Sequence, residues 1–216
     1  MAWLTSELDA DLGVMLSASH NPMPDNGIKF FARGGHKLAD DIEDAIEERI
    51  GEEWERPTGA DVGRISHDSR AGDRYGDFLE GTLDTQLDGL RVVVDCANGA
   101  AFDVSPRALE RAGAQVTAIH AQPNGWNIND GCGSTYMESL VAAVRDGGAD
   151  VGIAHEAHAA RCHAVDADGA RRTGRPRTTR EAQTHARGQN SGSGTGAGRR
   201  TAEHGRKERP QGRGRS

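Results

Sequence analysis

Three short apolar runs in the middle of the chain constrain its fold most. Each is long enough for a buried strand and too short for a buried helix. They are residues 90–95, 116–119 and 151–154. Helix signals lie between them, and strands that alternate with helices form a parallel sheet with right-handed crossovers. We therefore expect an α/β fold whose functional loops follow the carboxyl ends of the strands.

Residues typical of helix starts separate these runs. Ser105 and Pro106 predict an N-cap followed by a first-turn proline. Thr135 and Glu138 have the spacing of a capping box, which predicts a helix over 136–145. Both helices would cross from one predicted strand to the next.

Two further helices and a connection are predicted before residue 90. In an acidic stretch, apolar side chains recur at every fourth position, which is typical of an amphipathic helix. They are Leu38, Ile42, Ile46 and Ile50. Residues 51–73 are polar, with scattered Pro and Gly, and predict a connection between domains. The second helix is expected over 75–87, with Phe78, Leu79 and Leu83 on one face.

Composition changes sharply near residue 170. Residues 171–216 hold thirteen Arg and Lys against three acids, a formal charge of +10, and no Val, Ile, Leu, Met, Phe, Trp, Tyr or Cys. The whole chain carries −7, so residues 1–170 carry −17. Without large apolar side chains a segment cannot offset the entropy of ordering, so we expect a disordered basic tail over 170–216.

Two interpretations of this tail stay open. A reading-frame shift near codon 170 of a GC-rich gene would explain its Arg, Gly, Pro, Ala, Thr and Ser content. Alternatively, its basic clusters at 199–200, 206–207 and 213–215 contact RNA phosphates. No aromatic side chain is interleaved for base stacking, so such binding would be non-specific. The acidic front part argues against any other nucleic-acid surface.

The sequence also bears on the compartment. No apolar run has the length of a membrane span, and the first residues lack the regions of a signal peptide. Cys96, Cys132 and Cys162 are far apart and odd in number, which suits a reducing compartment. We therefore expect no membrane partner and a cytoplasmic location. The oligomeric state is left open.

Residues with catalytic potential gather in the loop LSASHNP, residues 16–22, which follows an apolar run. The Asp-Asn-Gly turn at 25–27 returns the chain into a second apolar run. An exposed Ser19 on a rigid loop, beside His20 and Lys29, is typical of a nucleophile that carries a covalent intermediate. A polar turn between two strands of a hairpin is the plainer interpretation.

This loop and its continuation, MPDNGIKFFARGGHKL at 23–38, resemble the phosphoserine loop of the α-D-phosphohexomutases, and most of all that of the bacterial phosphoglucosamine branch. Residues 92–101 and 127–135 resemble loops of the second domain of that family. The resemblance covers about residues 2–169. It implies mixed and parallel sheets with flanking helices.

The resemblance also implies domains. These are the C-terminal part of a first domain over 1–55, a linker and connecting helix over 56–88, a second domain over 89–169, and the tail. Family members are much longer, with four domains around one cleft. We therefore expect this chain to lack the sugar-selecting and phosphate-clamping loops of the third and fourth domains, and to have an open sheet edge.

The activity implied is an intramolecular phosphotransfer between glucosamine 6-phosphate and glucosamine 1-phosphate through a bisphosphorylated sugar. Ser19 would carry the phosphoryl group, whose transfer depends on in-line positioning and charge neutralisation. Lys29 would act as general acid or base, or lie solvated on its strand. His20 would hydrogen-bond the phosphoserine or brace the turn. A phosphomannomutase or phosphoglucomutase is the alternative within the family.

After the third strand the chain departs from the family pattern Asp-Gly-Asp-Ala-Asp-Arg, whose carboxylates hold Mg²⁺ beside the phosphoserine. In EAHAAR only Glu156 keeps a carboxylate, His158 offers a nitrogen that Mg²⁺ accepts poorly, and Ala160 offers no ligand. Ala157 replaces glycine and would strain the loop if it needs a left-handed backbone. Arg161 survives and is expected to pair with phosphate. We therefore expect damaged metal ligation and no turnover by this chain.

Overall fold

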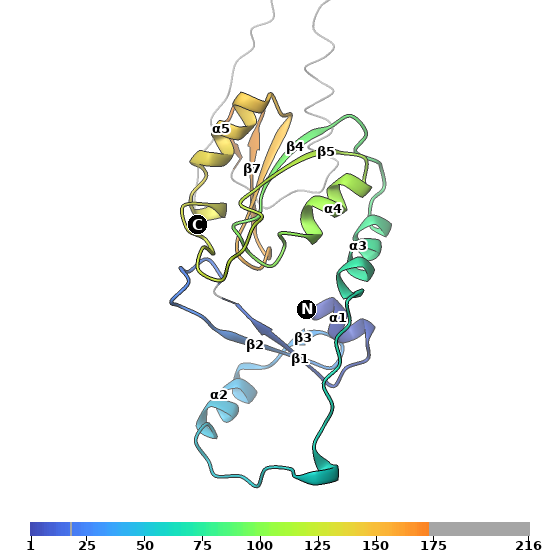
Figure 1. Ribbon diagram of the computed structural model, residues 1–216, viewed down its shortest axis with the longest axis vertical. Helices are drawn as coiled ribbons and strands as arrows, with labels where there is room; N and C mark the ends of the chain where they lie inside the picture. Colours follow the sequence, from blue (N-terminus) through green and yellow to red (C-terminus); the bar gives the residue numbers. More distant parts are fainter. Residues whose placement is uncertain (18, 173–216) are drawn as a thin grey trace, which may run out of the picture. The chain divides into compact units, whose positions relative to one another are not determined.

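A computed structural model describes residues 1–17 and 19–172 of the chain (Figure 1). Its larger sheet has five strands in the order β5-β4-β6-β7-β8. The strands are β4 (Arg91–Asp95), β5 (Gln115–Ile119), β6 (Val151–His155), β7 (Cys162–Asp166) and β8 (Arg171–Arg172). β4 pairs in parallel with β5 and β6, whereas β7 and β8 continue the sheet antiparallel. The expected α/β fold with mixed and parallel strands is confirmed.

Helices cover both faces of this sheet. Successive residues of a strand point to opposite faces, so Val92 and Val93 of β4 enter different cores. Val93 packs in the core that holds Leu140 and Val144 of α5 (Glu138–Gly147). Val92 packs on the other side, where Leu109 of α4 (Val104–Arg111) is partly buried.

Both predicted helix caps are wrong. Ser105 is the second residue of α4, and its hydroxyl hydrogen-bonds His155 Nε2 at 2.7 Å instead of capping the helix. Thr135 ends a separate 3₁₀ turn, η2 (Gly133–Thr135), and α5 begins only at Glu138. A polar side chain near a helix start can bond to tertiary partners, and the local pattern does not reveal that competition.

The N-terminal part builds a three-stranded antiparallel sheet from β1 (Leu12–Leu16), β2 (Ile28–Ala32) and β3 (His36–Lys37). Helix α1 (Ala2–Glu7) packs against β1, where Thr5 leaves no room for a side chain at Gly13. The predicted amphipathic helix is present as α2 (Asp40–Glu48). Its apolar face is not buried, because Ile42 and Ile46 are exposed.

Residues 51–70 of the predicted connection are exposed and contain a short 3₁₀ turn, η1 (Gly59–Asp61), whereas its last three residues already belong to the next helix. Helix α3 (Ala71–Gly81) follows and stops earlier than predicted, so Leu83 lies beyond its end. The Phe78 ring stacks on Trp3 of α1, with 4.9 Å between ring centroids.

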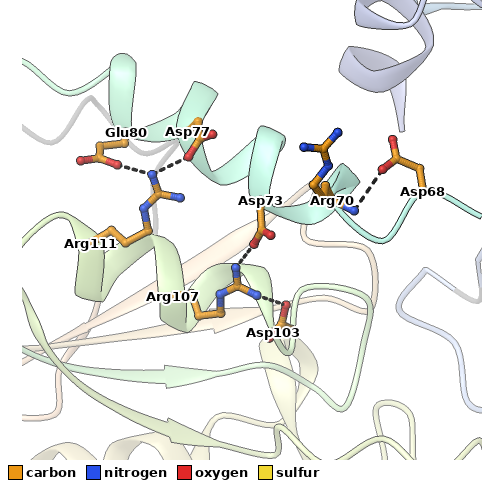
Figure 2. A network of polar contacts seen from close by, with 8 residues as sticks. All are labelled: Asp68, Arg70, Asp73, Asp77, Glu80, Asp103, Arg107 and Arg111. Carbon is orange, nitrogen blue, oxygen red and sulfur yellow. Dashed lines mark hydrogen bonds and ion pairs between the residues drawn. The ribbon is translucent and has the colours of Figure 1, made fainter.

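Ion pairs join α3 to α4 (Figure 2). Arg111 reaches Asp77 and Glu80 at 2.5 and 2.6 Å, and Arg107 binds Asp73. These acids lie on one side of α3 because residues three and four apart share a helix face. The acids of α3 therefore match the two arginines of α4 in register.

The predicted disordered tail is partly wrong. Arg171 and Arg172 form β8, paired with Val165 and Ala164 of β7, and Arg172 Nη2 lies 2.6 Å from Asp166 Oδ2. Ladder hydrogen bonds and ion pairs order these two residues without apolar burial. The rest of the predicted tail, with its frameshift and RNA-binding interpretations, lies outside the described residues. Within 1–17 and 19–172, no helix is long and apolar enough to cross a membrane.

Candidate functional site

The hairpin of β1 and β2 presents the serine loop. Leu16 pairs with Ile28 at the end of the ladder, and the Ser17 N–H donates to the Gly27 carbonyl at 2.9 Å to close the loop. Ser19 has a left-handed backbone with φ of 54°. Its N–H donates to Ser17 Oγ at 3.0 Å, which stabilises that conformation. The loop is therefore the polar turn of a β-hairpin, as the plainer interpretation predicted. The hydrogen bond from the Ser19 N–H holds Ser19 in this turn.

A second loop follows the carboxyl end of β6 and meets the first. Glu156 is 2% exposed, and its Oε2 accepts a hydrogen bond from Ser19 Oγ at 3.4 Å. The other carboxylate oxygen, Oε1, lies 3.4 Å from His158 Nε2 and 3.5 Å from Arg161 Nε. Two basic side chains of the same loop therefore surround the buried carboxylate.

Hydrogen bonds join the serine loop to the loop after β6 and to the loop after β5. The Ala157 N–H donates to the Ser19 carbonyl at 3.2 Å, and Ser17 Oγ hydrogen-bonds His158 Nδ1 at 3.2 Å. Asn129 Nδ2 donates to the carbonyls of Ser19 and Asn21 at 3.0 and 2.8 Å. Asn129 lies in the segment 127–135, which resembles a loop of the family's second domain, but nothing in the sequence selected this side chain.

The other predicted catalytic residues lie around Ser19. His20 is exposed, and its Nδ1 is 3.4 Å from Ser19 Oγ. Lys29 is exposed on β2, opposite Met15. Burial lowers the pKa of His158, and the positive charges of Lys29, Arg161 and His20 lower it further, against the opposing effect of Glu156. Burial and these positive charges therefore disfavour the protonated form of His158.

The expected strain at Ala157 is wrong. Ala159, and not Ala157, has the left-handed backbone of this loop, with φ of 55°. The constrained position is Gly99, which packs against the Ala157 backbone. A Cβ on Gly99 would lie 2.3 Å from the Ala157 carbonyl oxygen. The Ala100 N–H donates to the same oxygen at 2.6 Å. The loop after β4 therefore packs directly under the loop after β6.

The donor set around Ser19 does not fit Mg²⁺, which prefers six oxygen ligands. Glu156 supplies oxygens, but Oε1 already faces His158 and Arg161, and Ala160 supplies no donor. A hollow beside Arg91 and Gln115 lies at the N-terminal ends of β4 and β5, opposite the carboxyl ends of these strands.

Family models match most of the described chain. The model for the alpha/beta/alpha domain I of phosphoglucomutase/phosphomannomutase matches residues 1–56, and the model for domain II matches 73–169. The chain is 62% identical over 169 residues to the phosphoglucosamine mutase of Thermobifida fusca and 63% identical over 169 residues to that of Acidothermus cellulolyticus. These alignments cover 78% of this chain but 38% and 37% of the relatives, so the chain spans under two fifths of their length.

Solved structures show the same fold. A putative phosphomannomutase of Thermus thermophilus aligns over 79% of this chain and 40% of its own, with a TM-score of 0.64 and 23% identity. A phosphoglucomutase/phosphomannomutase family protein of Burkholderia thailandensis aligns over 74% of this chain and 34% of its own, with a TM-score of 0.61 and 23% identity.

Proposed function

Because the chain belongs to the phosphoglucomutase/phosphomannomutase family, we propose that Ser19 is the phosphoryl acceptor of a phosphoglucosamine mutase reaction. The reaction interchanges glucosamine 6-phosphate and glucosamine 1-phosphate through a bisphosphorylated sugar. One observation carries the proposal: the Ser19 hydroxyl donates to the buried carboxylate of Glu156, in a loop 137 residues further along the chain. The relatives at about 60% identity support the glucosamine branch over a phosphomannomutase or phosphoglucomutase.

The residues around Ser19 can supply a general base, a general acid and phosphate-binding groups for this transfer. As the Ser19 Oγ–phosphorus bond forms, the hydroxyl proton passes to Glu156 Oε2, which already accepts its hydrogen bond. The bond from phosphorus to the sugar oxygen breaks, and that oxygen takes a proton from Lys29, a general acid. Arg161, whose side chain is 71% exposed, and His20 bind the phosphoryl oxygens.

Membership of this family suggests a metal cofactor, and the resemblance specifies Mg²⁺. Since the donors of this chain do not fit that ion, no step of the proposed transfer passes through it. We propose instead that His158 and Ala160, at positions where the family has carboxylates, slow the transfer to Ser19, and the expected absence of full turnover by this chain stays a prediction. The domain boundaries at 55, 88 and 169 and the cytoplasmic location also stay predictions.

The test is transfer to Ser19 from a hexosamine bisphosphate. After incubation of the chain with glucosamine 1,6-bisphosphate, phosphopeptide mass spectrometry should locate the phosphoryl group on Ser19. Ser19→Ala should abolish the signal, and Ser17→Ala is the matched control that keeps a phosphorylatable Ser19. Phosphorylation elsewhere, or none at any dose, would contradict the proposal. Faster labelling from glucose or mannose bisphosphate would favour the alternative sugars.

Restoring the family's carboxylates in the loop after β6 tests whether that loop limits the rate of phosphoryl transfer to Ser19. The variant Glu156→Asp, His158→Asp, Ala160→Asp should label Ser19 faster than the unchanged chain, and only when Mg²⁺ is present. An unchanged rate with Mg²⁺ would show that the loop substitutions do not limit transfer.

A further inference from the structure

A second cluster of chemically active side chains lies away from Ser19. Asp95 ends β4, His120 directly follows β5, and Cys132 directly precedes η2. One ligand atom from each of the three lies within 4.8 Å of the others. Asp95 and Cys132 are completely buried, whereas the His120 side chain is 30% exposed. The end of β4 and the two ends of the loop between β5 and η2 therefore place one potential metal ligand each at a single point.

Backbone and amide groups orient two of these ligands. Asp95 Oδ1 accepts the Ala97 N–H and Oδ2 accepts the Gly133 N–H, both at 2.9 Å. Each carboxylate oxygen can accept a second partner. Asn98 Nδ2 lies 3.9 Å from Cys132 Sγ, a long contact that leaves the sulfur otherwise open. Such outer contacts are what hold metal ligands in position.

The third ligand has an unsatisfied atom. His120 Nδ1 is buried and makes no hydrogen bond within the described residues, although it lies 3.1 Å from Asp95 Oδ2. This nitrogen faces the Asp95 carboxylate without hydrogen-bond geometry, and a buried polar atom that makes no hydrogen bond is costly. A cation between this nitrogen and the carboxylate would satisfy both.

We propose that Asp95, His120 and Cys132 bind a thiophilic divalent cation of the zinc class. One carboxylate, one imidazole and one thiolate make a mixed donor set that zinc accepts and Mg²⁺ does not. A zinc ion with three protein ligands takes water as its fourth ligand. The ion would join the end of β4 to both ends of the loop between β5 and η2. The site does not depend on the phosphotransfer proposed for Ser19.

Cobalt(II) titration of the full chain under reducing conditions tests this site. Co²⁺ takes the place of zinc, and only a thiolate ligand gives an intense charge-transfer band in the near ultraviolet. We expect this band to saturate at one equivalent of Co²⁺ and to disappear when Zn²⁺ is added. Absence of the band from the unchanged chain would overturn the proposal.

Matched variants identify the ligands. Cys132→Ser should lose the band, and Cys162→Ser, which changes a cysteine of β7, should keep it. His120→Asn suits the left-handed backbone of this position and should weaken Co²⁺ binding by at least about tenfold. Circular dichroism confirms that each variant is folded. A band that survives in Cys132→Ser, or is lost in Cys162→Ser, would overturn the proposal; unchanged affinity in His120→Asn would do the same.

Discussion

The five-stranded sheet and the β1–β2 hairpin carry similar apolar residues but bury them very differently. Val92 and Val94 of β4 are 2% and 0% exposed, whereas Leu12 and Leu16 of β1 are 51% and 71% exposed. Helices α4 and α5 cover both faces of the larger sheet, but α1 packs against the Gly13 face of the hairpin, opposite these leucines. An apolar pattern therefore identifies the face that can be buried, and the tertiary structure decides whether anything covers it.

The largest effect expected from this comparison is a cavity in the core of the larger sheet. Leu140→Ala should lower the free energy of unfolding by about 2–5 kcal/mol, because Leu140 is completely buried against β4 and β6. Leu16→Ala should change it by less than about 0.5 kcal/mol. Urea denaturation measures both. Equal losses would show that the exposed face of the hairpin is covered in solution.

The next effect concerns the contact between loops. Gly99→Ala should destabilise the chain by about 1–3 kcal/mol, because the added Cβ meets the Ala157 backbone, which cannot rotate away. Gly63→Ala is the matched control, since nothing lies within 4 Å of a Cβ at that position. The same urea denaturation compares the two variants. Equal free energies of unfolding of the two variants would mean that the loops after β4 and β6 can move apart without loss of stability.

A smaller effect is expected where the hairpin loop meets the larger sheet. Asn129→Asp replaces the donor of two hydrogen bonds to the Ser19 and Asn21 carbonyls, each worth about 0.5–1.5 kcal/mol. Hydrogen exchange should accelerate over residues 17–27 and stay unchanged in β4. Acceleration in β4 as well would indicate that the substitution unfolds the whole chain.

The smallest effect is the pH dependence of stability to which His155 of the larger sheet should contribute. Burial lowers the pKa of His155 below its ordinary value of 6.5 in the folded chain. Below that ordinary value the unfolded chain binds a proton that the folded chain does not, so stability falls as the pH falls and levels off below the folded pKa. His155→Gln should reduce the loss of unfolding free energy between about pH 7.5 and 5.5.

The control for that measurement is His67→Gln, which changes an exposed histidine of the connection. It should leave the pH dependence as it is. A slope that is the same in both variants would show that His155 does not carry it.

Local patterns predicted three of the five strands of the larger sheet, β4, β5 and β6, to within one residue at each end, because each is a contiguous apolar run, but they did not predict β7. They failed at Ser105 and Thr135, where the cap signal is local but the partner of Ser105, His155, is fifty residues away. They also missed Asn129, whose partners in the serine loop lie more than one hundred residues earlier. They also missed strand β8, because Arg171 and Arg172 have no apolar side chain and are held by backbone pairing with β7.

The sequence by itself determined the family, through the loop at 16–22, and the positions of the buried strands, because both depend on contiguous residues. By the same resemblance, His158 and Ala160 stand where the family has carboxylates, and Glu156 keeps one. Only the tertiary structure decided that Glu156 meets Ser19, that Gly99 supports Ala157, and that Asp95, His120 and Cys132 converge. Those contacts join loops whose approach depends on strand order and packing, which no local pattern encodes.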